Sequence, residues 1–256
     1  MKHVALKPVL FVVTLVMSVS LACSVVAGTS PTQAPPNQPV ETQPPVQLTA
    51  EPIQPTEPPA TAIPPTQSQF YTEEWDNGLG NWVQQVELNR SDGDKTQAQI
   101  RVDSGNLVFD LGKELIAYVF LPSFSYKNVR IDARVDNRGT NVNDVLLVCR
   151  KSDEGHYLVN IANSGLYAMY AFDAAKGTYT RIADGGSNKI KQGKDVNDYT
   201  LICNDRTLTL LINGNKTRAY TDNQFVFGAG QIGVGVASEE QLPVKVAFES
   251  VKISQP

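Results

Sequence analysis

Several features of helical, membrane-spanning or nucleic-acid-binding proteins are missing from this sequence. From residue 70 onward no stretch keeps a helical hydrophobic period for three turns, which argues against a helical domain. The longest apolar run, over residues 8–22, is too short to span a bilayer comfortably. No basic patch stands out, and residues 70–256 carry about 20 basic and 23 acidic side chains. The sequence therefore predicts no nucleic-acid partner.

Side chains that catalyse reactions or bind transition metals are also scarce. His156 is the one histidine after residue 69, and the polar run over residues 152–156 indicates a solvent-exposed turn residue. No Gly-x-Ser-x-Gly motif accompanies it, which argues against a Ser-His-Asp hydrolase. Cys149 and Cys203 with His156 lack a fourth zinc ligand at a useful spacing. We therefore predict no catalytic residue and no metal ligand set.

Two loops leave a structural calcium ion open as an alternative. Residues 92–94 and 184–188 carry oxygen ligands of the kind that calcium prefers. Neither loop has the spacing of a dedicated calcium loop, so we expect no cofactor.

The first 22 residues have the features of a signal peptide. Lys2 and Lys7 precede the apolar run, which ends in small residues before Cys23. Residues 19–23, VSLAC, resemble a bacterial lipobox, in which the cysteine is acylated and becomes the mature N-terminus; Ser20, where leucine is usual, is a departure. We expect an extracytoplasmic protein that is anchored to the bacterial cell membrane through a lipidated Cys23 alone. Ordinary secretion and a retained membrane anchor are the alternatives.

Residues 23–69 differ in composition from the rest of the chain. They hold twelve of the sixteen prolines, interleaved with threonine, glutamine and alanine. Such a segment cannot bury a core, and its prolines favour an extended polyproline II conformation. We predict a disordered linker that acts as a spacer.

Residues 70–256 read as an all-β domain. About thirteen strand-like runs recur every 8 to 14 residues, with turn signals between them. In residues 130–136, Ile131, Ala133 and Val135 share one face while charged residues occupy the other. Asn213 and Gly214 form a strong hairpin signal after the run over residues 199–212. We predict a two-sheet antiparallel jelly-roll sandwich.

The last strand shows a change of phase. Its apolar side chains fall on even positions up to Phe248 and on odd positions from Val251. One strand buries both sets only if an extra residue is inserted, so we predict a β-bulge near Glu249 or Ser250.

The cysteines predict a link between two strands of this domain. If Cys23 is lipidated, Cys149 and Cys203 are the remaining thiols of an exported domain, and such a pair usually forms a disulfide. Each cysteine is in phase with the core-facing residues of its strand. We predict a Cys149–Cys203 disulfide, with two separate buried thiols as the alternative.

A hairpin at residues 163–165 assigns faces to two further strands. A two-residue loop there would place Tyr157, Val159 and Ile161 on the core face with Ala168, Tyr170 and Phe172. Leu158 and Asn160 would then share the opposite face with Tyr167 and Met169. A three-residue loop would reverse this pairing.

Sugar recognition needs aromatic faces for stacking and planar polar groups for hydrogen bonds. Arg150 is out of phase with the core-facing residues of its strand, and Asn160 and Tyr167 are predicted to lie on the outer face of theirs. With Arg134, they predict a small ligand patch on one sheet face. The alternative is that Arg150 is paired structurally and that Tyr167 covers an edge.

Several strand sequences resemble a known family. They are VLLVCR (residues 145–150), GHYLVNI, SGLYAMY, YTLICNDRTLTLLING, FGAGQIGVGV and VAFESVKI. This order resembles bacterial surface lipoproteins with a concanavalin A-like, laminin G-like jelly-roll domain, and it is similar to the 3-keto-disaccharide hydrolase domain. The resemblance covers about residues 70–254. It implies the fold rather than an activity, because this sandwich hosts lectins, glycanases and adhesion modules alike.

No carboxylate pattern of a glycanase accompanies the resemblance. The Glu-x-Asp-x-Glu triplet of laminarinase-type enzymes is missing, and Asp132 and Asp136 alternate with arginines as a surface charge ladder would. We therefore expect a monomeric, non-catalytic module that binds carbohydrate or another cell-surface ligand. A glycoside-processing hydrolase of the 3-keto-disaccharide type and a structural envelope protein are the alternatives.

Overall fold

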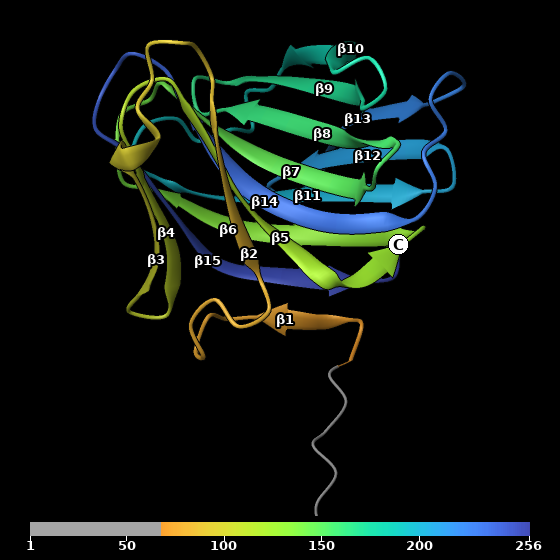
Figure 1. Cartoon of the computed structure of the whole chain (residues 1–256), viewed down its shortest axis with the longest axis horizontal. Helices are drawn as coiled ribbons and strands as arrows, with labels where there is room; N and C mark the ends of the chain where they lie inside the picture. The colour runs from red at the N-terminus through yellow and green to blue at the C-terminus, as the bar shows by residue number, and fades with distance from the viewer. Residues whose placement is uncertain (1–67) are drawn as a thin grey trace, which may run out of the picture. The chain divides into compact units, whose positions relative to one another are not determined.

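The computed structural model describes residues 68–256 (Figure 1). The predicted signal peptide, Cys23 and residues 23–67 of the predicted linker lie outside the described residues. Among residues 68–256, no helix is long and apolar enough to cross a membrane. The regular structure there consists of β-strands and one short 3-10 helix, η1 (Lys95–Gln97).

Fifteen strands in the described part of the chain form two antiparallel sheets, which Figure 1 shows as two layers. The eight-stranded sheet has the order β13 (Asn215–Thr221), β12 (Thr207–Ile212), β11 (Val196–Asn204), β6 (Val129–Asn137), β15 (Val244–Ser254), β4 (Asn106–Leu111) and β3 (Ala98–Asp103), and β1 (Tyr71–Glu73) also pairs with β15. The seven-stranded sheet has the order β10 (Thr178–Gly186), β9 (Leu166–Asp173), β8 (Gly155–Ala162), β7 (Asn143–Lys151), β14 (Gly230–Ser238), β5 (Leu115–Tyr126) and β2 (Val83–Leu88). The predicted two-sheet antiparallel sandwich is confirmed.

The core lies between the sheets and consists of alternate residues of most strands. Val145, Leu147 and Cys149 point inward from β7, as their phase predicts. At the start of the domain Trp75 and Trp82 are buried, with ring centroids 5.5 Å apart. Glu73 fixes this pair, because it accepts a hydrogen bond from Trp82 Nε1 at 3.1 Å.

A disulfide joins the two layers. Cys149 of β7 and Cys203 of β11 are bonded, which confirms the predicted pairing, and both are fully buried. The bond links residues 54 positions apart, and the chain-entropy model assigns such a loop about 4 kcal/mol of stabilisation.

The predicted bulge in the last strand is also present. The register of β15 against β6 shifts between Phe248 and Ser250. The extra residue is Glu249, and because of it both Phe248 and Val251 are fully buried despite their opposite phase.

The hairpin between β8 and β9 differs from the prediction. Its loop has three residues, Asn163 to Gly165, so Tyr157 pairs with Ala171 and Val159 with Met169. The expected two-residue loop is wrong, and the faces of β9 are reversed. Gly165 permits the longer loop, since its φ of 107° favours glycine. As a result, Tyr167, Met169 and Ala171 face the core, whereas Ala168, Tyr170 and Phe172 face outward.

Candidate functional site

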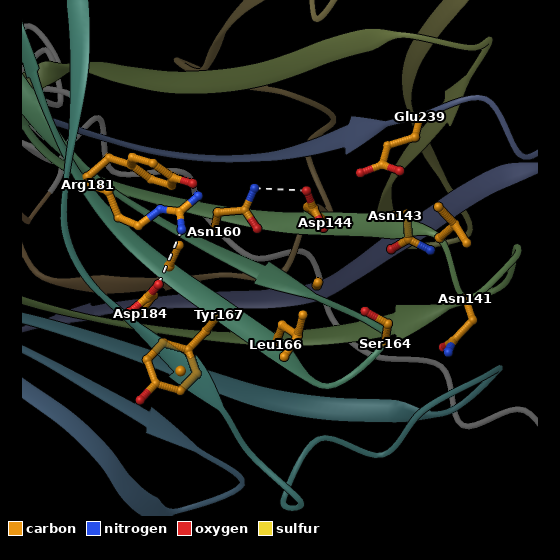
Figure 2. Close-up of a pocket in the computed structure, with 15 residues that line it drawn as sticks. Asn141, Asn143, Asp144, Asn160, Ser164, Leu166, Tyr167, Arg181, Asp184 and Glu239 are labelled. Carbon is orange, nitrogen blue, oxygen red and sulfur yellow. Dashed lines mark hydrogen bonds and ion pairs between the residues drawn. The ribbon is translucent and has the colours of Figure 1, made fainter.

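A hollow lies on the outer face of the seven-stranded sheet (Figure 2). Its volume is about 580 Å³, within the usual range for small-molecule sites. Strands β7, β8, β9 and β10 form its floor, and the segments before β7 and after β14 add to its rim. The polar side chains that line it are Asn141, Asn143, Asp144, Asn160, Ser164, Tyr167, Tyr170, Arg181, Asp184 and Glu239.

A hydrogen-bonded pair of polar side chains lies on the floor of the pocket. Asp144 and Asn160 point outward because they alternate with the core residues Val145 and Ile161. Asn160 Nδ2 donates to Asp144 Oδ2 at 2.8 Å. Burial raises the pKa of Asp144, the hydrogen bond from Asn160 opposes this, and the charge of Glu239 adds to the rise.

Strand β10 supplies the other end of the pocket. A bulge between Arg181 and Ala183 lets both Arg181 and Asp184 face outward although they are three residues apart. Arg181 Nη1 lies 3.2 Å from Asp184 Oδ2, and its guanidinium lies 5.8 Å from the ring centroid of Tyr170. Figure 2 shows this ion pair at one end of the pocket, Asn160 and Asp144 in the middle, and Asn143 and Glu239 toward the other end.

Away from the pocket, the middle of this face is apolar. Leu146 and Val148 of β7 and Leu158 of β8 are buried there, together with Tyr118 and Phe120 of β5. These two aromatic rings stack with centroids 5.2 Å apart. The polar chemistry of the central strands is therefore concentrated at the end where Asp144 lies.

His156 lies at the opposite end of the same face, and its predicted exposure is wrong. The strand begins at Gly155, earlier than the polar loop suggests, so His156 is part of β8. It is 8% exposed and packs against Phe172 and Tyr179, with the Tyr179 hydroxyl 3.3 Å from Nε2. Burial, together with the charge of Lys151, lowers the pKa of His156 to about 4.

Arg150 is not part of an exposed patch, contrary to the prediction. Residues 148–151 of β7 lie opposite residues 231–233 of β14, so β7 contains a bulge, and Arg150 has a φ of 57°. Because of the bulge, the side chain does not point to the outer face, as regular alternation along the strand would predict. It is 2% exposed and donates hydrogen bonds to the carbonyl oxygens of Lys127, Asp205 and Phe227, which belong to three different loops.

The other three predicted ligand residues do not share one exposed face either. Arg134 lies on β6 of the eight-stranded sheet, where it forms ion pairs with Asp198 and Glu249. Tyr167 is 7% exposed and faces the core, because the hairpin loop has three residues, although its ring reaches the pocket wall. Asn160 alone lies on the outer face, as predicted, and it lines the pocket.

Sequence reasoning missed Asp144, Arg181 and Glu239, and it considered Asp184 only as part of a candidate calcium loop. The phase that places Val145 in the core also places Asp144 outward, and Glu239 continues the outward positions of β14. The outward positions of Asp144 and Glu239 could therefore have been predicted from the sequence. Arg181 and Asp184 come together through a bulge that no hydrophobic pattern indicates.

The described residues contain no group of three or more histidine, cysteine, aspartate or glutamate side chains that is arranged to hold a metal. In the first candidate calcium loop, Asp92 pairs with Lys113 at 2.9 Å and Asp94 caps η1. In the second, Asp184 pairs with Arg181.

Comparisons with known proteins show the fold. No family model and no curated protein matches the chain. Among solved structures, carbohydrate-binding module CBM66 from Bacillus subtilis is 12% identical with a TM-score of 0.51, over 68% of this chain and 96% of that one. A protein of unknown function with a galectin-like fold, also from B. subtilis, is 11% identical with a TM-score of 0.55, over 72% and 94%. A Bacillus licheniformis β-glucanase is 9% identical with a TM-score of 0.54, over 75% and 100%. The described domain is thus a jelly-roll sandwich of the galectin-like and concanavalin A-like type.

Proposed function

We propose that the chain is a non-catalytic module that binds a glycan in the pocket on β7 to β10. The observation that carries this proposal is the combination of one aromatic ring with several planar polar groups in one hollow. Tyr170 offers a ring, Asn160 an amide, and Arg181 a guanidinium beside them. This is the combination that sugar recognition requires. The fold adds support, since solved structures with the same sandwich include a carbohydrate-binding module and a glucanase.

Binding of neutral oligosaccharides to the full chain, purified in detergent, tests the proposal. We expect Tyr170→Ala and Asn160→Ala each to weaken binding at least about tenfold, or about 1.4 kcal/mol, in isothermal titration calorimetry. Arg134→Ala is the matched control. It removes a polar side chain on the other sheet, so its affinity should equal that of the unchanged protein.

Two results would contradict the proposal. If none of a broad set of oligosaccharides binds, the result would favour a structural envelope protein. Equal losses in the Tyr170 and Arg134 variants would mean that the ligand binds elsewhere.

A glycoside-processing hydrolase is the second candidate, and one observation favours it. Asp144 has a raised pKa and a second carboxylate, Glu239, nearby, which is how a general acid and its partner are arranged. Product analysis after incubation with the bound oligosaccharides separates the two functions. A hydrolase would release products and lose that activity in Asp144→Asn, whereas a binding module would leave the sugars intact.

We also propose that Cys23 carries a lipid that holds the module at the outer surface of the bacterial cell membrane. The sequence before Cys23 supports this assignment. Cells grown with labelled palmitate should label the unchanged chain, and Cys23→Ser should lose the label and leave the membrane fraction. A labelled Cys23→Ser chain would contradict the assignment.

A further inference from the structure

Tyr179 is a large aromatic side chain that lies partly open to solvent beside the pocket. It is 44% exposed and belongs to β10, which is the edge strand of the seven-stranded sheet (Figure 1). On this strand Arg181, which lines the pocket, lies opposite Tyr170 of β9. Tyr179 lies opposite Phe172, two residues further along the same outward face. The surface next to the pocket therefore ends in an exposed aromatic ring.

This ring is held in place despite its exposure. Its centroid lies 4.7 Å from that of Phe172, 5.7 Å from that of His156 and 6.2 Å from that of Tyr170. The hydroxyl lies 3.3 Å from His156 Nε2. Packing on three sides fixes the side chain before any ligand arrives, so little conformational entropy is lost when a ligand covers the ring. An exposed aromatic ring that is ordered in advance is well suited to binding.

The outer face is filled on the other side of the pocket, toward β5. Tyr118 and Phe120 of β5 lie over Gly235 and Gly233 of β14, where a side chain on either glycine would collide with these rings. Leu146 of β7, opposite Gly235, is 1% exposed. Because the central strands are covered in this way, the open surface that continues from the pocket follows β9 and β10 rather than crossing β14 and β5.

We propose that Tyr179 is a second stacking platform, on which a glycan held in the pocket places a further sugar unit. The glycan leaves the pocket past Arg181 and follows β10 toward the end of the face where His156 lies. A tyrosine ring suits this role because it offers a broad, rigid and largely apolar face for a sugar to cover. The inference rests on the proposed glycan binding and adds that the site extends beyond the pocket and prefers an oligosaccharide to a single sugar.

Sugars of different length bound to the full chain, purified in detergent, test the platform. The probes are glucose, mannose and N-acetylglucosamine, each compared with its own linear hexasaccharide. We expect Tyr179→Ala to weaken binding of the hexasaccharide at least about fivefold in calorimetry, because the ring contact is lost. The monosaccharide, followed by NMR titration, should bind equally well to Tyr179→Ala and to the unchanged protein, since it occupies the pocket alone. Unchanged monosaccharide binding also shows that the variant is folded.

Three further variants show whether stacking on the ring is the cause. Tyr179→Phe keeps the ring and loses the hydroxyl, so its affinity for the hexasaccharide should match that of the unchanged protein. Tyr170→Ala removes the ring that lines the pocket and should weaken binding of both lengths. Tyr220→Ala is the matched control, because it removes a partly buried tyrosine from β13 of the other sheet, and it should leave both affinities unchanged.

The outcomes separate this inference from the proposed function. An unchanged hexasaccharide affinity in Tyr179→Ala, together with a loss in Tyr170→Ala, would overturn the platform and leave glycan binding standing. Equal losses for both lengths in Tyr179→Ala would mean that Tyr179 only supports the pocket, which also overturns the platform. A loss in Tyr179→Phe as large as that in Tyr179→Ala would assign the effect to the hydroxyl rather than to stacking. Binding of none of these sugars would overturn both proposals.

Discussion

Lowering the pH from 7 to 5 should destabilise the sandwich through His156. This side chain is 8% exposed, and burial together with the charge of Lys151 lowers its pKa to about 4 from an ordinary 6.5. The folded protein therefore binds fewer protons than the unfolded chain between these two values, so stability falls as the pH falls. The full difference corresponds to about 3.4 kcal/mol, of which about 2 kcal/mol is lost by pH 5.

Urea unfolding at pH 7 and pH 5 measures this loss. Trp75 and Trp82 are buried and report unfolding by fluorescence. The decisive variant is His156→Gln, which keeps a polar side chain but does not titrate. It should be less stable than the unchanged protein at pH 7, because the ring contacts with Phe172 and Tyr179 are lost. Between pH 7 and pH 5 its unfolding free energy should fall by about 2 kcal/mol less than that of the unchanged protein.

Carboxylates also change the unfolding free energy between pH 7 and pH 5. Their contribution is the same in the unchanged protein and in His156→Gln, so it cancels when the two proteins are compared. The other histidine of the chain, His3, lies in the predicted signal peptide, so His156 is the one histidine expected in the mature protein. The reasoning is refuted if His156→Gln loses as much stability between pH 7 and pH 5 as the unchanged protein does.

Two further predictions concern the end of the sandwich near Arg150. Arg150→Met should lower the unfolding free energy by at least about 3 kcal/mol, because three carbonyl groups lose a charged donor. Arg134→Met, which removes exposed ion pairs, should lower it by only about 0–1 kcal/mol. Similar values for the two variants would contradict the buried role of Arg150. Replacing both Cys149 and Cys203 by alanine should cost about 4 kcal/mol in urea unfolding, and an unchanged midpoint would show that the cross-link contributes no stability.

The sandwich could be predicted because its signals are local. The alternation in residues 130–136 and the phase change after Phe248 follow from the two-residue period of a strand, and both features are present. The disulfide could be predicted from the number and phase of the cysteines. None of these inferences needs knowledge of which strands are neighbours.

The candidate site depends on irregularities that the two-residue period of a strand does not reveal. The bulge at Arg150 turns a predicted surface side chain inward, and the third loop residue before β9 moves Tyr167 to the core. The bulge in β10 brings Arg181 and Asp184 together. Each irregularity moves a side chain to the other face without changing the hydrophobic pattern on either side of it.

The cross-links of β7 and the proposed ligand pocket lie at opposite ends of this strand. On β7, Cys149 and Arg150 connect one end to the other sheet and to three loops, while Asp144 lies at the other end in the pocket. The raised pKa of Asp144 means that its ionised form costs stability at neutral pH. Asp144→Asn removes that cost, so the variant should unfold at the same or a higher urea concentration than the unchanged protein. Loss of binding in this variant would therefore report on the site rather than on unfolding.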